Sequence, residues 1–322
     1  MVKIVQCVPN FSEGKDLDKI EDIVSVLKNK EGFNLVSYEP DGDYNRTVVT
    51  LLGDPRKIIE AVVELTGKVL EHVDMNVQSG EHPRMGAVDV IPFIPIQGVT
   101  MEECIEYANI IGKKINDKYD IPVFLYAEAA KKKDRVRLPN IRKGEFEGMK
   151  EKIKLENWYP DFGKPVIHPT FGVVGVGARI PLIAYNIDLD TKNIKVASNI
   201  AKAIRGSSGG FKYIQAGPVY LDNRGHVQVT MNILDYKKNP IYRIFETVKM
   251  EAKRYHVKVT SSELVGLLPK DSLVRSIRYY FKVNSLDFDK EMTIEDLTTN
   301  AIKYLKFRDF DKFKIIEANI LW

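Results

Sequence analysis

The sequence predicts an α+β protein in which one order of elements, β-α-β-β-α-β, occurs twice. Three observations support this prediction. Short apolar segments alternate with segments whose apolar residues recur at helical spacing. Turn sequences rich in Asp, Asn and Gly join the two middle strands of each copy. The same order begins again after residue 178, although the similarity lies in the elements and not in residue identity.

The first copy is predicted as strand, helix, two strands, helix and strand. Its first helix carries acidic residues early and lysines late, as the helix dipole favours. Its second helix begins with Asp54 as N-cap and Pro55 at the first helical position. The predicted strands are 3–10, 33–39, 46–53 and 89–96, and the predicted helices are 16–30 and 54–73.

The second copy repeats this order, with "DNRG" between its middle strands and Pro240 at the start of its second helix. An antiparallel sheet with helices on one face is typical of such an order, so we expect two ferredoxin-like subdomains. The predicted strands are 182–189, 213–221, 226–234 and 257–268, and the predicted helices are 192–205 and 240–256.

A helix (100–119), an apolar strand (121–129) and an irregular stretch (131–177) are predicted between the copies. Irregular stretches this long are usually functional or disordered in compact proteins. The aromatic side chains of Trp158 and Phe171 argue against disorder here. The stretch is therefore expected to carry a function.

The composition excludes several classes of protein. No apolar run approaches the roughly 18 residues that span a bilayer, and the first residues lack the apolar core of a signal peptide. Cys7 and Cys104 form neither a C-x-x-C pair nor a disulfide framework, which favours a cytoplasmic protein. The net charge of +4 comes from 48 basic and 44 acidic residues, so no nucleic-acid partner is indicated. The five histidines lack zinc-helix spacing, and no metal is expected.

The segment "GEHPRMGAVDVIPFIPI" (80–96) joins a polar cluster directly to a buried strand. His82 lies in this cluster, between two glycines and beside Glu81. An acid–base group on a short loop against an apolar wall is well placed for pKa tuning. His82 is therefore a candidate catalytic residue, although a lone histidine is often only structural.

Eight segments follow one another along the first 270 residues: "QCVPNFSEG" (6–14), "NRTVVTLLG" (45–53), "GEHPRMGAVDVIPFIPI" (80–96), "GVTMEEC" (98–104), "IRKGEFEG" (141–148), "YPDFG" (159–163), "LIAYNIDLDT" (182–191) and "SELVGLLP" (262–269). Together they resemble the glutamate formimidoyltransferase, or formiminotransferase, family. The resemblance implies two ferredoxin-like subdomains with a ligand cleft between them. We expect an N-terminal subdomain over 1–177, a C-terminal subdomain over 178–270 and a helical extension over 271–322.

The resemblance also implies an activity. The family transfers the formimino group of N-formimino-L-glutamate to N5 of tetrahydrofolate, a step of histidine degradation, with the folate as co-substrate and no metal. Its catalytic histidine corresponds to His82, whose imidazole, titrating near neutrality, could act as base and then as acid. A cytoplasmic homodimer without membrane or nucleic-acid partners is the implied form.

The family's folate-binding segment corresponds to residues 163–172, within the irregular stretch. This chain departs from the family pattern at His168. The segment consists of Gly163, Lys164, Pro165, Val166, Ile167, His168, Pro169, Thr170, Phe171 and Gly172.

The donor carries two carboxylates, which call for arginine forks. We expect Arg46 and Arg84 to bind them, with an ordinary ion pair as the alternative for each. Glu81 or Asp89 would orient the His82 ring, as a carboxylate does in other histidine-based sites.

Two further functions stay open at this point. One is formyl transfer between 5-formyltetrahydrofolate and glutamate, and the other is folate binding without catalysis. The intact "EHPRMG" (81–86) favours an enzyme, because a binding protein needs no proton carrier. Only about 50 residues follow residue 270, so we expect a transferase unit without the cyclodeaminase domain that some relatives carry.

Overall fold

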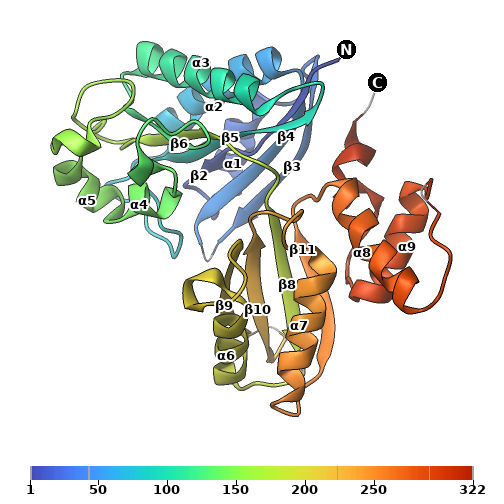
Figure 1. Ribbon diagram of the computed structural model, residues 1–322. Helices are drawn as coiled ribbons and strands as arrows, with labels where there is room; N and C mark the ends of the chain where they lie inside the picture. Colours follow the sequence, from blue (N-terminus) through green and yellow to red (C-terminus); the bar gives the residue numbers. More distant parts are fainter. Residues whose placement is uncertain (1, 43, 223, 290, 321–322) are drawn as a thin grey trace. The chain divides into compact units, whose positions relative to one another are not determined.

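The computed structural model describes residues 2–42, 44–222, 224–289 and 291–320, and it confirms the predicted α+β class (Figure 1). The chain divides into two compact units, residues 1–179 (unit 1) and residues 180–322 (unit 2). This division lies close to the predicted boundary after residue 177. The predicted three-part division and the ligand cleft between the subdomains stay predictions.

Unit 1 is built on a seven-stranded sheet. Strand β4 pairs with β3 on one side and with β1 and β2 on the other, and β5 pairs with the same two short strands. The sheet continues in parallel from β5 through β7 to β6. The strands are β1 (Ile4–Cys7), β2 (Asn10–Phe11), β3 (Phe33–Asp41), β4 (Arg46–Gly53), β5 (Val88–Gln97), β6 (Val123–Ala127) and β7 (Val174–Ala178).

The predicted strand 3–10 is thus two strands. Pro9 interrupts it, because proline has no N–H for the ladder. The predicted helix 16–30 is also shorter than expected, since α1 (Leu17–Ser25) gives way to tight turns in which Leu27 N–H donates to the Val24 carbonyl at 2.9 Å. Asn29 then adopts the left-handed conformation (φ +54°) that commonly follows a helix.

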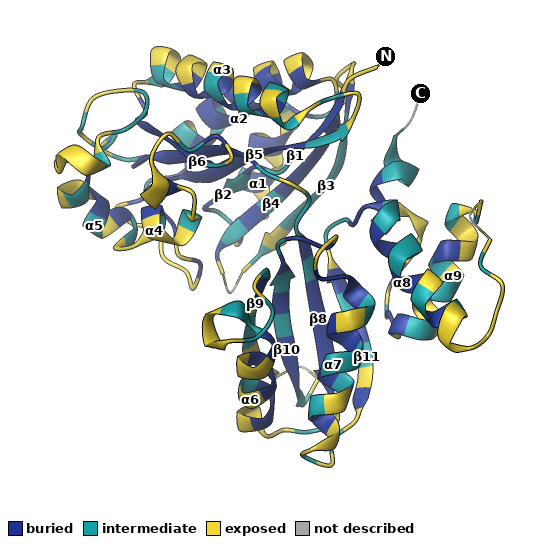
Figure 2. Ribbon diagram, viewed as in Figure 1, coloured by how far each residue is buried: buried dark blue, intermediate teal, exposed yellow. Residues whose placement is uncertain are grey.

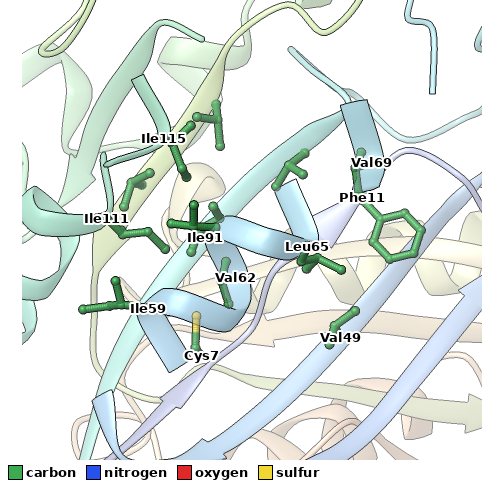
Figure 3. Close-up of a cluster of buried hydrophobic side chains, with 14 of the residues drawn as sticks. Cys7, Phe11, Val49, Ile59, Val62, Leu65, Val69, Ile91, Ile111 and Ile115 are labelled. Carbon is green, nitrogen blue, oxygen red and sulfur yellow. The ribbon is translucent and has the colours of Figure 1, made fainter. Parts of the chain in front are cut away.

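Helices α1, α2 (Pro55–His72) and α3 (Met101–Tyr119) pack on this sheet, and their apolar side chains form the main core of unit 1 (Figure 3). The predicted cap of α2 is confirmed, because the Asp54 side chain accepts from the backbone N–H groups of the first turn. Fully buried core residues come from strands and helices alike, among them Cys7, Val62, Ile91 and Ile111.

The stretch 131–177 is more regular than predicted. It contains two short helices, α4 (Leu138–Arg142) and α5 (Glu145–Lys152), and nearly all of the buried strand β7. Glycine is depleted in strands, so Gly175 and Gly177 concealed β7 in the sequence. A Cβ on Gly177 would lie 2.6 Å from the Tyr126 ring, so the close packing of β6 on β7 requires a residue without a side chain.

Unit 2 has a four-stranded antiparallel sheet in the order β11-β8-β10-β9. The last strand therefore pairs with the first, and the middle strands form a hairpin. The strands are β8 (Ile183–Leu189), β9 (Ile214–Leu221), β10 (His226–Ile233) and β11 (Val259–Val265), and helices α6 (Ile194–Ile204) and α7 (Ile241–Lys253) pack on them. Figure 2 shows buried strands in both units beneath helices whose outer faces are exposed.

The residues after 270 complete the core of unit 2. Helices α8 (Lys270–Val283) and α9 (Ile294–Leu305) contribute buried side chains to it, and so does the segment that follows them. Phe307 forms a β-bridge with Ser262 of β11, and Ile315 forms one with Leu268. Removing this part of the chain would therefore expose apolar surface of the second sheet.

Candidate active site

The loop that carries His82 is held against its neighbours by close backbone contacts. His82 N–H donates to the Tyr44 carbonyl at 3.3 Å, and the Ser12 hydroxyl donates to the Gly86 carbonyl at 3.0 Å. A Cβ on Gly80 would lie 2.5 Å from the Tyr44 oxygen. The glycines at either end thus let the loop approach neighbouring backbone segments more closely than a side chain would allow.

The His82 ring is buried, with 7% of the residue exposed. No described residue forms a hydrogen bond with its two nitrogens. Burial, together with the positive charges of Arg142, Arg46 and Arg84, lowers the pKa of His82 to about 3. The imidazole is therefore neutral at neutral pH in the protein by itself, and its expected titration near neutrality during turnover stays a prediction.

Arg84 is fully engaged by protein groups. Its Nε donates to the Gln78 side chain at 3.0 Å, and Nη1 and Nη2 each donate to Glu147, at 3.0 and 2.8 Å. Nη1 also donates to Glu145 at 2.8 Å. Since Glu145 and Glu147 belong to α5, Arg84 ties the His82 loop to that helix. That Arg84 binds substrate stays a prediction, but a donor carboxylate would have to displace these partners.

Asp89 holds a different part of the same loop. Its carboxylate, 1% exposed, accepts the Met85 N–H at 3.0 Å and pairs with Nη2 of Arg142 at the end of α4. No hydrogen bond joins it to His82 among the described residues. Asp89 therefore fixes the backbone next to His82 and anchors Arg142, while the exposed Glu81 stays a predicted orienting residue.

Arg46 begins β4 and is half-buried. Its guanidinium lies 5.3 Å from the centroid of the Tyr44 ring, and its Nε is buried without a hydrogen-bond partner among the described residues. Burial lowers the pKa of Arg46, and the nearby charge of Arg142 acts in the same direction. Arg46 and Arg142 are thus close cations beside one neutral histidine.

The predicted folate segment, 163–172, lies beside the His82 loop in unit 1. Gly172 forms a β-bridge with Gly86, and Ala87 N–H donates to the Phe171 carbonyl at 2.8 Å. Within the segment, His168 and Gly172 exchange two backbone hydrogen bonds, and Nδ1 of His168 accepts from Phe171 N–H at 3.2 Å. Phe171 is fully buried, whereas the part around Val166 is exposed. This arrangement joins two segments about 85 residues apart in sequence.

Comparison with known proteins shows the family of this chain. The model of the formiminotransferase domain, N-terminal subdomain, matches residues 4–179, and that of the formiminotransferase domain matches residues 184–321. The chain is 47% identical to glutamate formimidoyltransferase of Streptococcus pyogenes serotype M1 over 91% of this chain and 98% of that one. The chain belongs to the formiminotransferase family.

Two further relatives extend this result. Glutamate formimidoyltransferase of Thermoplasma acidophilum is 41% identical over 89% of this chain and 95% of that chain. Formimidoyltransferase-cyclodeaminase of Gallus gallus is 38% identical over 89% of this chain, but the match covers 54% of that longer protein. The predicted family and the predicted enzyme class, a transferase, are thereby confirmed.

Three residues of this site were not predicted: Arg142, Glu145 and Glu147. All lie in "IRKGEFEG" (141–148), which carried part of the resemblance without an assigned role. Their contacts with Asp89 and Arg84 depend on the packing of α4 and α5, which the sequence did not indicate. Arg142, for example, is 53 residues away from Asp89 along the chain.

The described residues contain no group of three or more His, Cys, Asp or Glu side chains arranged to hold a metal ion. Within the same residues, no helix has the length and apolar character needed to cross a membrane.

Proposed function

We propose that this protein transfers the formimino group of N-formimino-L-glutamate to N5 of tetrahydrofolate, with His82 as the proton carrier. Two relatives that are named glutamate formimidoyltransferase support the reaction. The observation that carries the assignment of His82 is its setting, a buried and neutral imidazole whose nitrogens bond to no described residue, beside the segment 163–172 and three arginines.

The chemistry requires one proton to move between two nitrogens. The N5 lone pair attacks the formimino carbon and forms a tetrahedral intermediate, after which N5 must lose its proton. The bond between that carbon and the glutamate nitrogen then breaks, and this nitrogen must gain a proton to leave as the amine. A neutral imidazole can accept the first proton and return it in the second step. The protons lost and gained in these steps are equal in number, so the reaction needs no external acid, base or redox partner.

The surrounding residues have separate tasks in this proposal. Residues 163–172 bind the reduced folate, so N5 is presented to the adjoining His82 loop. Arg46 binds a carboxylate of the donor, because its guanidinium retains donor capacity. Arg84 acts as a positioning residue, since its carboxylate and amide partners hold the loop on α5.

A direct assay tests this function and its alternatives. The protein is incubated with tetrahydrofolate and N-formimino-L-glutamate, while the new folate species is followed by its absorbance. A parallel reaction contains 5-formyltetrahydrofolate and glutamate. Turnover in the first mixture only is the expected result. Turnover in the second mixture alone would indicate formyl transfer as the function. Folate binding without turnover in either mixture would indicate a folate carrier.

A further inference from the structure

Two of the arginines near His82, Arg46 and Arg142, share one feature. Nε of Arg46 and Nε of Arg142 are buried, and neither forms a hydrogen bond with a described residue. By contrast, Arg84 donates from all three of its guanidinium nitrogens. A buried donor without an acceptor is energetically unfavourable. An added acceptor at Arg46 and Arg142 would therefore be favourable.

The charges around His82 make this acceptor an anion. Arg46 on β4 and Arg142 on α4 repel each other, and both oppose protonation of the ring. Asp89 on β5 and Asp41 on β3 offset part of the charge of Arg46. However, Asp89 is already committed to Arg142 and to a backbone amide of the loop. Cations close together in a half-buried site favour a bound carboxylate.

We propose that Arg46 and Arg142 jointly bind the α-carboxylate of the donor, and that this negative charge makes His82 a proton acceptor. The inference rests on the proposed function, because it takes the glutamate donor as the ligand. In that donor the formimino nitrogen and the α-carboxylate share one carbon atom. The nitrogen that exchanges a proton with His82 therefore lies nearer to the α-carboxylate than to the γ-carboxylate.

The arrangement couples donor binding to acid–base chemistry. In the protein by itself, three cations and burial hold the pKa of His82 at about 3, so the ring accepts a proton poorly. A carboxylate between Arg46 and Arg142 opposes those cations and raises the pKa of the ring. Arg142 is thus a substrate-binding residue, and Asp89 is the positioning residue that holds it.

A titration of His82 by NMR, in protein labelled at histidine, tests this coupling without turnover. The signal is assigned by its loss in His82→Asn. Three stable probes are added in turn: N-formyl-L-glutamate, N-formylglycine, which keeps only the α-carboxylate, and N-formyl-4-aminobutyrate, which keeps only the distal one. The first two should raise the pKa of His82 by about one unit or more, and the third should not. No rise at saturating N-formyl-L-glutamate, or no binding of it, overturns the proposal.

Variants of Arg142 separate this role from a structural one. Arg142→Gln removes a cation, so it should raise the pKa of His82 in the protein without probe. It should also abolish the further rise on adding N-formyl-L-glutamate and weaken its binding about tenfold or more. Arg137→Gln is the matched control, because Arg137 is exposed and lies one turn earlier. It changes the net charge equally and should behave as wild type.

A double variant controls for the destabilisation that Arg142→Gln can cause. Arg142→Gln leaves Asp89 buried without its cation, which can destabilise the chain. The double variant Asp89→Asn/Arg142→Gln removes both charges and keeps an oxygen for the Met85 N–H. It should show the same loss of the probe-induced pKa rise. A rise as large as in wild type, in either folded variant, contradicts the role of Arg142.

The proposed function and this inference can fail separately. A probe-induced rise in the pKa of His82 without transferase turnover would contradict the proposed function and support the carboxylate site. Transferase turnover that is equal in Arg142→Gln and Arg137→Gln would sink the inference and leave the function in place.

Discussion

Gly86 and Gly172 face each other in an antiparallel β-bridge, which joins the loop of His82 to the end of the segment 163–172. The neighbouring amide of Ala87 extends this contact to the Phe171 carbonyl at 2.8 Å. The proposed proton carrier and the proposed folate segment are therefore connected through main-chain contacts. A change in this backbone contact should act on both at once.

Gly86→Ala tests that connection. A Cβ at this position would lie 2.0 Å from the Val173 carbonyl oxygen, so the two backbones must move apart. We expect the free energy of unfolding to fall by about 2–3 kcal/mol and turnover to fall about tenfold or more. Urea unfolding and steady-state kinetics measure the two effects. Gly148→Ala in α5, where a Cβ meets nothing within 4 Å, should leave turnover unchanged. Equal stability and turnover of the two variants would contradict the role of the backbone contact at Gly86.

His82→Asn tests the proton carrier. The variant should fold and bind folate, because no described residue depends on the ring for a hydrogen bond. Turnover should fall by about 10²–10⁴-fold, the usual contribution of a positioned acid–base group. kcat and kcat/KM should fall together, since the lost interaction belongs to the transition state. Near wild-type turnover by a folded His82→Asn protein would show that the histidine is only structural.

The low pKa of His82 also predicts a pH-dependent stability. The ordinary value is 6.5, and the folded protein holds the group at about 3, so between these values the unfolded chain binds a proton that the folded chain does not. Stability is therefore retained above pH 6.5 and lost as the pH falls toward 3. Between pH 7 and pH 5, wild type should lose about 2 kcal/mol more than His82→Asn in urea unfolding.

The control for this measurement is His256→Asn. His256 is exposed, and asparagine tolerates its left-handed backbone (φ +55°). This variant should lose as much stability on acidification as wild type does. If His82→Asn also follows wild type, the ring is not held neutral in the folded state.

Arg46→Lys and Arg84→Lys should differ in their kinetics. A lysine is a point charge and cannot replace the fork, so Arg46→Lys should raise KM for the donor more than it lowers kcat. Arg84→Lys loses bonds to Gln78 and Glu147, so it should lower Tm and kcat with a smaller effect on KM. Initial rates over a range of donor concentrations distinguish the two. A larger KM effect for Arg84→Lys would indicate that Arg84 itself binds the donor.

Much of the fold could be predicted because its signals are local. The cap at Asp54, the apolar spacing of α2 and the turn before β4 each lie within a few residues. The order of strands and helices follows from such signals. Strand β7 was not predicted because Gly175 and Gly177 lower strand propensity. Its glycines pack against the side chains of Met85 and Tyr126, which are distant in sequence.

The candidate site was predictable only in part, for the same physical reason. The loop around His82 has a dense local pattern, and the family resemblance indicated residues 163–172. The electrostatics of the ring depend on Arg46 and Arg142, which lie in other parts of the sequence. The carboxylate partners of Arg84 come from α5, and no spacing in the sequence relates them to it.

The packing of the last helices into unit 2 has a consequence for biosynthesis. The core of unit 1 uses no residue beyond 179, whereas that of unit 2 includes Ile315. Translation therefore delivers a complete unit 1, with His82 and the segment 163–172, well before the second sheet can bury its apolar face. Until residue 315 leaves the ribosome, the core that β8 to β11 share with the later segments stays incomplete. The nascent chain should thus depend on chaperones during the second half of its synthesis more than during the first.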